Sequence, residues 1–492
     1  MTPLAAQRRL MEQALLRTPG DVDLRLGLGA HCLAQGEVDS ALRHAVAAAA
    51  LRPDWQAELL LGRVHLQRGQ ADDAAARLHA AASRAQAPAA ARAAAWRMLA
   101  DLRLNAFGDP GGAAQALQAC AALAPAHALD ADLAAVVAAL YEGGADAGAM
   151  GARLRLLAAR LPVPAAPVLA PRSRPGQRLR IGLVSAQFCA SPVGFLTLGA
   201  LRVVAQQADL FFFDRGAKDD WARSAFQAIA HRWVGCAGAD TATLHQLMAA
   251  ADLDALIDLG GWTDPAALAA VAGRPARRLL KWVGGQSLTT GLDCFDGFVA
   301  DGRQAPPAAQ PLYVEPLLRA SDNYVSYTAP PYAPELDAAA RQPPLPQGRP
   351  APGCVALVSN PAKISAATAE AVRRLAPRRL VLVDHRWRHA GTRAAAEQRL
   401  GPLMAIAEFH TPAHHPAYLE TLRGLDALFL DTRPYAMGLT AIELRLLGKH
   451  VRLARPPARA PMCARHAVGH YGAATLAGHA RLGAELLRWC GP

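Results

Sequence analysis

The chain has 492 residues, of which 52% are hydrophobic and 19% charged, a composition that excludes a disordered chain and predicts two or three folded domains. Its net charge of +12 favours anionic partners, but the arginines are scattered and no Lys/Arg run exceeds two residues, which argues against specific nucleic-acid binding. The first sixteen residues lack the apolar core of a secretory signal, and no run of about 18 apolar residues predicts a membrane span.

The first part of the chain, residues 1–160, contains an internal repeat. The segment LGAHCLAQGEVDSAL (28–42) aligns with LGRVHLQRGQADDAA (61–75), with Gly29 matching Gly62 at an offset of 33 residues. A looser third copy runs from 96 to 125. This period resembles the tetratricopeptide repeat and predicts stacked helix pairs that cross closely at the small residues; a plain Ala-rich helical bundle is the alternative. Such arrays commonly present a face to a protein partner or to their own catalytic domain.

A Pro-rich linker is expected at 161–178, and the hydrophobic period changes directly after it. Short apolar runs then alternate with helical stretches, as in a parallel sheet covered on both faces. The expected strands are 179–185, 209–214, 254–261 and 278–285. The pattern predicts a first α/β domain over 179–341.

A second Pro-rich linker, 342–353, precedes another series of the same kind, which predicts a second α/β domain over 354–492. Its expected strands are 355–359, 379–384, 405–409, 426–432 and 450–454. The predicted fold class is therefore α/β with an N-terminal all-α repeat arm and two Rossmann-like domains in tandem. Two such sheets place their strand ends toward one cleft, where phosphate-bearing ligands usually bind.

Lysine supplies only four of the 52 basic residues, namely Lys218, Lys281, Lys363 and Lys449. Lys363 follows the first expected strand of the second domain and precedes a helix that Ser365 would cap. A helix start offers free backbone N–H groups, and an ammonium is a compact cation that fits against a phosphate. We therefore expect Lys363 to face a diphosphate; a chance lysine on a loop is the alternative.

Eight cysteines lie far apart with no C-x-x-C pair, which predicts free thiols in a reducing cytoplasm rather than disulfides or a zinc site. His410, His414 and His415 are close in sequence, but they have no acidic or thiolate companions there, and we expect no metal site. The expected protein is cytoplasmic, without a metal or organic cofactor.

Several motifs stand in the α/β part in a fixed order. They are RIGLVSAQF (180–188), DALIDLGGWT (254–263), RPARRLLKWVGG (274–285), SNPAKIS (359–365), and LDTRPY followed by TAIELRLLGKHV (430–451). Their order and spacing, together with the repeats, resemble the O-GlcNAc transferases and their bacterial repeat-containing relatives over most of the chain. The resemblance implies a GT-B type glycosyltransferase fold. It also implies an inverting, metal-independent transfer of a sugar from a nucleotide diphosphate to Ser or Thr of a protein.

The resemblance also implies roles for particular residues. Lys363 would neutralise the departing diphosphate, and Asn360 on the same turn would bond the nucleotide. Glu443 occupies the acidic position that holds the ribose hydroxyls, a role that suits a carboxylate chemically; an ordinary helix-surface acid is the alternative. Thr440 matches a threonine of the phosphate-contacting loop. Tyr435 matches a tyrosine of the bacterial relatives and is expected only to shape the turn.

Four further residues are weaker candidates. Tyr418 occupies a position at which the family usually has histidine, and Arg465 falls at a recurrent arginine without a clear role. Asp254 and Asp258 are strand-end acids near the expected cleft, and a structural role suits them at least as well as a catalytic one.

The sequence also departs from the family pattern. Ser191, Phe195 and Trp262 stand where the family has histidines, and neither serine nor phenylalanine can replace an imidazole in proton transfer. Met437 and Leu439 occupy usually polar positions of the nucleotide loop. The sequence also stops short of the helices that normally close the family's fold.

Two functions of different classes follow. The retained Asn360, Lys363 and Glu443 favour a glycosyltransferase that moves GlcNAc or a similar sugar from a UDP-sugar to a protein. The missing histidines favour a catalytically impaired or inactive family member that acts as a repeat-based protein-binding scaffold. In both cases the repeats predict a polypeptide partner, and the first function also requires a nucleotide sugar. Nucleic-acid binding through the basic surface is a third hypothesis and predicts strongly salt-dependent affinity.

Overall fold

The computed structural model describes residues 3–144, 146–169, 176–285, 287–341, 349–466 and 475–491. The chain forms two compact units. The first, called the repeat unit here, consists of Met1–Ala138, Asn360–Ala362 and Arg386–Gly401. The second, called the α/β unit, consists of Ala139–Ser359, Lys363–His385 and Pro402–Pro492. Residues 170–175 of the first predicted linker and 342–348 of the second lie outside the described residues.

The repeat unit is built from antiparallel helix pairs, as the repeated sequence predicts. Its helices are α1 (Pro3–Arg17), α2 (Val22–Ala34), α3 (Val38–Leu51), α4 (Trp55–Gln67), α5 (Ala71–Ser83), α6 (Ala89–Leu102) and α7 (Pro110–Leu123), followed by α8 (Ala128–Glu142), which extends into the α/β unit. The helices α2 and α3 pack as one pair and α4 and α5 as the next, and the second pair repeats the first 33 residues later.

The repeated small residues have the packing role that the sequence suggests. A Cβ on Gly29 would lie 2.7 Å from a methyl group of Leu60, and a Cβ on Gly62 would lie 2.8 Å from Leu78. Both positions therefore allow close helix crossings. The turn glycines Gly36 and Gly69 have φ values of +76° and +68°, in the left-handed region that favours glycine.

The third helix pair differs from the first two. Helix α6 runs on into a π-helical turn, η1 (Arg103–Phe107), before Asp109 caps α7. Helix α16 (Ala390–Leu400), which comes from the second half of the sequence, packs against this turn. Asp72 of α5 accepts hydrogen bonds from the first backbone N–H groups of α16, at 2.8 Å from Gly391 and 3.2 Å from Ala390. The repeat array thus caps a helix that is distant in sequence.

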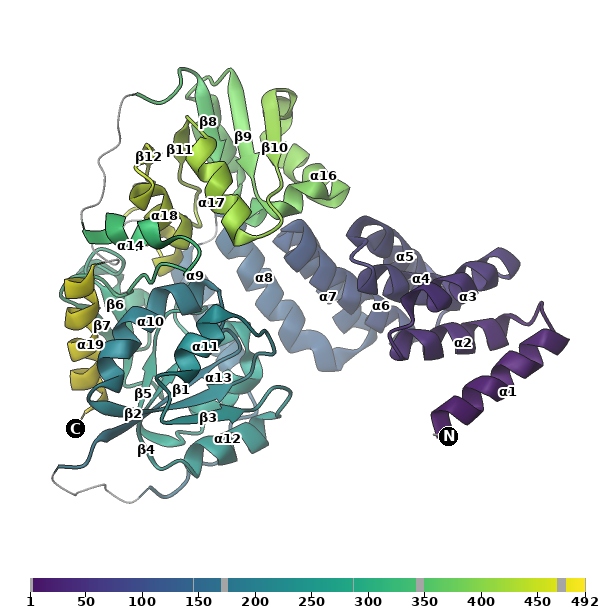
Figure 1. Cartoon of the computed structure of the whole chain (residues 1–492), viewed down its shortest axis with the longest axis horizontal. Coiled ribbons are helices and arrows are strands. Elements are labelled where there is room, and N and C mark those ends of the chain that lie inside the picture. The colour runs from purple at the N-terminus through teal and green to yellow at the C-terminus, as the bar shows by residue number, and fades with distance from the viewer. Residues whose placement is uncertain are drawn as a thin grey trace. The chain divides into compact units, whose positions relative to one another are not determined.

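The α/β unit contains two parallel sheets (Figure 1). The first has the strand order β3-β2-β1-β4-β5-β6-β7. Its strands are β1 (Leu179–Ser185), β2 (Ala208–Asp214), β3 (Arg232–Gly235), β4 (Leu253–Asp258), β5 (Ala276–Lys281), β6 (Gly297–Asp301) and β7 (Leu317–Ala320). Its helices include α10 (Pro192–Ala205), α11 (Trp221–Gln227), α12 (Thr241–Ala249), α13 (Pro265–Ala272) and α14 (Pro334–Arg341), with α9 (Ala147–Ala158) preceding them.

The second sheet has the order β10-β9-β8-β11-β12, and all of its pairs are parallel. Its strands are β8 (Cys354–Leu357), β9 (Arg379–Val383), β10 (Ala407–His410), β11 (Leu428–Leu430) and β12 (Val451–Arg452). Helices α15 (Ala366–Arg373), α17 (His415–Gly424) and α18 (Leu439–Leu446) connect them. Apolar side chains of β8, β9 and β11 pack with those of α17 and α18 in one buried cluster.

One large core joins the first sheet to helices of the second half. It contains side chains of β1, β2, β4 and α10, and it reaches Leu419, Ile442 and Leu446 of the second half. The last helix, α19 (Leu476–Cys490), packs on α10 and contributes Leu482 and Leu486 to this core. The sequence did not predict this closing helix, because its burial depends on α10, which is distant in sequence.

Three strands were also missed from sequence. Strands β3 and β7 are only four residues long and lie at the two edges of the first sheet, so they carry little continuous apolar sequence. Strand β6 is fully buried, but it begins at Gly297 and ends at Asp301, so its continuous apolar run is only three residues long (298–300). The cysteines all remain free, as expected. Within the described residues, no helix is long and apolar enough to cross a membrane.

Candidate functional site

The connection order of the second sheet reverses between the neighbouring strands β8 and β11. Open parallel sheets bind ligands outside the carboxyl ends of the strands at such a reversal. The loop after β8 carries Lys363, and the loop after β11 carries Asp431 and Tyr435. The topology thus places Lys363 beside the segment LDTRPY.

Hydrogen bonds hold these two loops together. Ser365 caps α15 by accepting from the Thr368 backbone N–H, as the sequence predicts, and its hydroxyl donates to the Arg433 carbonyl. The Thr368 hydroxyl donates to the same carbonyl at 3.0 Å and accepts from the Arg433 N–H at 2.9 Å. The backbone that carries Lys363 is therefore fixed against the loop after β11.

The Lys363 ammonium has few partners. Its Nζ donates to the Ala436 carbonyl at 2.8 Å and lies 4.6 Å from the centre of the Tyr435 ring. Within the part of the chain that the structure describes, no carboxylate forms an ion pair with it. Burial lowers the pKa of Lys363 to about 8, against a weaker opposing effect of the Asp431 charge. This shielded cation has no counter-ion among the described residues, and a bound phosphate would supply one.

The groups around Lys363 are rigidly held. The Tyr435 hydroxyl bonds to Ser287 Oγ at 2.8 Å, and Tyr141 stacks on its ring with centroids 4.6 Å apart. The Asp431 carboxylate accepts from the backbone N–H groups of Met437 (2.7 Å) and Ala454 (3.0 Å). The Asp431 carboxylate thus bonds to the loop backbone and forms no ion pair with the Lys363 ammonium.

Glu443, the predicted ribose ligand, is not a surface acid: only 1% of its side chain is exposed. Its Oε1 lies 3.0 Å from His415 Nε2, and the Tyr327 hydroxyl donates to it at 3.5 Å. Tyr327 comes from the first half of the α/β unit, so this carboxylate lies where the two halves meet. Burial raises the pKa of the Tyr327 hydroxyl, with a further contribution from the Glu443 charge, and Tyr327 therefore stays a donor.

His415 lies inside an aromatic cluster. The Tyr332 hydroxyl lies 2.8 Å from its Nδ1, and the ring of Phe195 is 5.1 Å away, centroid to centroid. The ring of Tyr418 stacks beside it at 6.0 Å. Sequence reasoning considered His415 only as a metal ligand and missed this contact with Glu443. One signal in the sequence pointed to a site role for His415. It begins a helix that follows an expected strand of the second sheet, and ligands bind near such strand ends.

Thr440, which is three residues before Glu443 in the sequence, lies beside Tyr418. The Tyr418 hydroxyl donates to the Val358 carbonyl at 2.8 Å and lies 3.4 Å from Thr440 Oγ1. Burial raises the pKa of Tyr418, so it does not act as an acid near neutral pH. Tyr418 thus connects the loop after β8 with the start of α18, and Thr440 and Glu443 share that helix.

Asn360 belongs to the repeat unit. Its Oδ1 accepts from the Ala362 backbone N–H at 3.0 Å, and a Cβ on Gly108 would lie 2.8 Å from that oxygen. Its side chain therefore shapes a turn against η1. A role in nucleotide binding stays a prediction.

Two of the weaker candidates have structural partners instead of a place in the site. Asp258 is fully buried, pairs with Lys281 at 3.6 Å, and accepts from the N–H groups of Gly260 and Gly261. Asp254 lies near the opposite end of β4, where it accepts from the Arg180 N–H at 2.8 Å. The cleft is expected at the carboxyl end of β4, which Asp258 occupies. Asp254 is four residues earlier on the same strand, about 13 Å from that end. The expectation that both acids lie near the cleft is therefore wrong for Asp254.

Arg465 supports a loop. Its guanidinium donates to the carbonyls of Pro456 (3.1 Å) and Pro457 (2.5 Å), and burial lowers its pKa. Both of these bonds come from Nη2, whereas the Nε of Arg465 is buried without a hydrogen-bond partner in the described residues.

The residues at the family's histidine positions are also structural. Ser191 caps α10 by accepting from the Gly194 N–H, and Phe195 is 3% exposed in the core. The Trp262 indole donates to the Thr290 carbonyl at 2.9 Å. Of the two loop departures, Met437 is buried beside the second sheet, and Leu439 packs against the large core.

The three neighbouring histidines have separate partners. His410 bonds to Glu408 at 2.7 Å, His414 caps α17 through the Ala417 N–H, and His415 contacts Glu443. No group of three metal-ligating side chains occurs in the described ranges.

The architecture is therefore that of a GT-B type glycosyltransferase preceded by helical repeats. A lysine-to-methionine mutant of the Thermobaculum terrenum O-GlcNAc transferase matches the chain with a TM-score of 0.72 at 23% identity, over 100% of this chain and 94% of that one. At this identity the likeness establishes the fold, and the chain is O-GlcNAc transferase-like in architecture.

Two plant proteins match a short part of the sequence. They are the probable UDP-N-acetylglucosamine–peptide N-acetylglucosaminyltransferases SPINDLY of Petunia hybrida, with 32% identity over 101 residues, and of Solanum lycopersicum, with 31% identity over 101 residues. Each match covers 20% of this chain and 11% of the relative, so the chain spans about a tenth of the length of these relatives. No family model matches the chain.

Proposed function

We propose that the chain is a divergent O-GlcNAc transferase-like enzyme of the cytoplasm. It transfers GlcNAc or a similar sugar from a UDP-sugar to Ser or Thr of a protein, with inversion and without a metal. The observation that carries this proposal is the Lys363 ammonium, which lies at the reversal point of the second sheet and forms no ion pair with a carboxylate of the described residues. The plant relatives, whose names specify UDP-N-acetylglucosamine and a peptide, support this donor and this class of acceptor.

In this reaction the acceptor hydroxyl attacks the anomeric carbon from the face opposite the diphosphate. The bond between that carbon and the phosphate oxygen breaks, and its electron pair leaves with UDP. The cation of Lys363 then stabilises the charge that develops on the departing oxygen, an effect that grows in a shielded site. Lys363 is thus the assigned catalytic residue, while Thr440 and Asn360 are assigned to the nucleotide.

Glu443 is assigned to the ribose. Its Oε1 already accepts from His415 and Tyr327, and the lone pairs of its Oε2 are left for the ribose hydroxyls. The proton of the acceptor hydroxyl passes to water, and we assign no residue to it, because Ser191, Phe195 and Trp262 contribute to caps and packing rather than to proton transfer.

A transfer assay tests the proposal. The purified protein is incubated with UDP-GlcNAc and a mixture of Ser/Thr-containing peptides, and mass spectrometry detects the added sugar. Wild type is expected to modify at least one peptide, and Lys363→Met to slow transfer by about 100-fold or more. Lys218→Met, which removes an exposed lysine paired with Asp220, is the matched control and is expected to leave the rate unchanged.

Equal rates for Lys363→Met and wild type would overturn the assignment of Lys363. UDP binding without transfer to any peptide or protein would instead support the inactive, scaffold-type function.

A further inference from the structure

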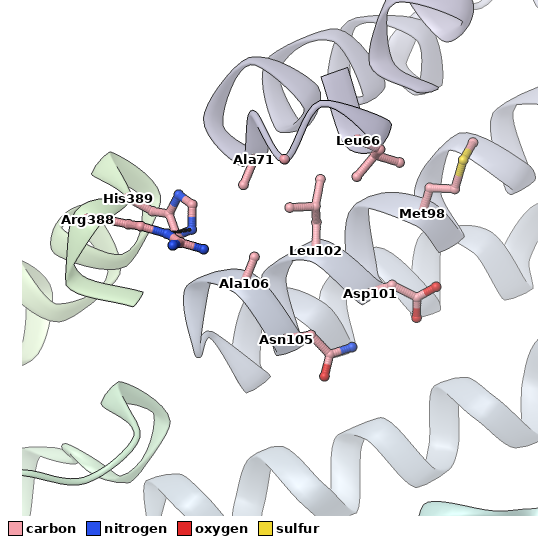
Figure 2. A pocket seen from close by; sticks show the side chains of 10 residues that line it. Leu66, Ala71, Met98, Asp101, Leu102, Asn105, Ala106, Arg388 and His389 are labelled. Atoms are coloured by element: carbon pink, nitrogen blue, oxygen red, sulfur yellow. Dashed lines mark hydrogen bonds between the residues drawn. The ribbon is translucent and has the colours of Figure 1, made fainter. Parts of the chain in front are cut away.

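The repeat unit contains a pocket of about 340 Å³ that the proposed transfer reaction does not use. It is lined by Leu66, Gly69, Ala71, Met98, Asp101, Leu102, Asn105, Ala106, Arg388 and His389. Figure 2 shows Leu102 near the middle, with Arg388 and His389 on one side and Met98 and Asp101 on the other. The lining residues come from α4, α5, α6, η1 and the segment just before α16.

The floor of the pocket is apolar. Leu66, Met98 and Ala106 are partly buried and pack against the cluster that contains Ala71 and Leu102. Ala106 lies in the π-helical turn, and such turns are frequent at functional sites. A floor of this kind accommodates an aliphatic side chain, since burial of apolar surface is favourable.

Arg388 is held at one side of this floor. Its Nε donates to His389 Nε2 at 3.2 Å, and His389 Nδ1 lies 3.5 Å from the Asp72 carboxylate. His389 is only 7% exposed, and burial lowers its pKa, which keeps the ring neutral with Nε2 as an acceptor. The chain from Asp72 through His389 thus orients Arg388 before any ligand arrives.

The remaining guanidinium donors of Arg388 face solvent. The Arg388 side chain is exposed, and no carboxylate in the described ranges forms an ion pair with it. A guanidinium with free donors recognises a carboxylate through two parallel hydrogen bonds. The side of the pocket formed by Arg388 therefore complements an acidic group.

Asp101 makes the two sides of the pocket opposite in charge. It lies across the floor from Arg388 (Figure 2). Asp101 is exposed, and the negative charge of its carboxylate repels a second acid placed beside it. An acidic ligand group is thus favoured beside Arg388 and disfavoured beside Asp101.

We propose that this pocket binds an extended polypeptide that places an aliphatic side chain on the Leu66–Met98–Leu102 floor and an Asp or Glu side chain on Arg388. A polypeptide is the favoured occupant because stacked repeats offer extended surfaces for chains, and because the pocket is at the small end of the range for complete small-molecule ligands. This binding is independent of sugar transfer, since the pocket shares no residue with the Lys363 site.

Selection from a random peptide library on the immobilised full-length protein tests the proposal. The enriched peptides are expected to share a Leu, Ile, Val or Met within two positions of Asp or Glu. Their affinities for wild type, Arg388→Glu, Met98→Lys and Asp101→Asn are then measured by fluorescence anisotropy of labelled copies.

Arg388→Glu and Met98→Lys are each expected to weaken binding by about tenfold or more, and Asp101→Asn to strengthen it a few-fold. Arg17→Gln, an exposed arginine of α1, is the matched control and is expected to have no effect. Circular dichroism checks that each variant is folded. Lys363→Met should bind the peptides as wild type does, which separates this proposal from that for the reaction.

Failure to enrich any peptide would overturn the proposal, as would enriched peptides that bind Arg388→Glu and Met98→Lys unchanged. A requirement for basic instead of acidic residues would also contradict it.

Discussion

Lys281 and Lys363 lie in different sheets of the α/β unit, and their ammonium groups have very different partners. Lys281 is fully buried, pairs with Asp258 at 3.6 Å, and donates to backbone carbonyls, the nearest being that of Gly284 at 2.5 Å. Lys363 donates to a single carbonyl and pairs with no carboxylate of the described residues. A paired buried charge holds a fold together, whereas an unpaired one favours an anionic ligand. The comparison assigns Lys281 to stability and Lys363 to binding.

The largest expected effect concerns Lys281. Its replacement by methionine leaves the Asp258 charge buried with only the N–H groups of Gly260 and Gly261 as partners. We expect Lys281→Met to lower the free energy of unfolding of the α/β unit by about 3–5 kcal/mol. Urea unfolding followed by tryptophan fluorescence measures the change.

The double variant Lys281→Met/Asp258→Asn serves as the control, since it removes both charges. It should lose less stability than Lys281→Met alone. A fully stable Lys281→Met would show that the pair is dispensable and would remove the basis of the comparison.

The second effect is on the pH dependence of stability. Burial lowers the pKa of Lys363 to about 8, below its ordinary value of 10.5. Between these pH values the unfolded chain binds more protons than the folded one, so this lysine makes the unliganded protein more stable as the pH rises. Relative to Lys363→Met, wild type should gain on the order of 2 kcal/mol from pH 7.5 to 10.5.

Urea unfolding of both proteins at several pH values measures this difference. A difference that stays constant across the window would contradict the shielded state of the ammonium.

A smaller effect is expected at Glu443. Glu443→Gln keeps an acceptor for His415 but removes the charge that strengthens hydrogen bonds from the ribose hydroxyls. We expect UDP to bind about tenfold more weakly, whereas an analogue without the two ribose hydroxyls should bind wild type and variant equally. Calorimetry with both ligands provides the measurement. Equal losses for both would show that Glu443 acts only by supporting the fold.

The smallest expected effect is at Tyr435. Tyr435→Phe removes the hydrogen bond to Ser287 but keeps the ring near Lys363, so UDP affinity should change by less than about twofold. Tyr435→Leu also removes the ring and should have the larger effect on affinity. The two variants are compared in the same UDP titration. A larger loss for phenylalanine than for leucine would contradict a role of the ring.

Much of the fold was predictable because its signals are periodic. The offset from Gly29 to Gly62 predicted the helix pairs, and the apolar run 179–185 coincides with β1. The edge strands β3 and β7 and the helix α19 were not predictable, because their burial depends on neighbours that are distant in sequence. The docking of α16 on the repeats depends on Asp72 and could not be inferred from local patterns.

The candidate site was predictable only in part. The position of Lys363 between a strand and a capped helix has a local signal, and the structure confirms the cap at Ser365. The contacts of Glu443 with His415 and Tyr327 have none, since they join residues 28 and 116 positions apart. Asp254 was misplaced because it is the second residue of β4, whereas ligands bind at the carboxyl ends of parallel strands, where Asp258 lies.

Titration of the protein with UDP by calorimetry tests the central claim most directly, with wild type, Lys363→Met and Lys218→Met measured side by side. The account predicts binding to wild type and Lys218→Met, and at least a tenfold weaker affinity for a folded Lys363→Met. Equal affinity of UDP for Lys363→Met and wild type, or no binding to wild type at all, would contradict it.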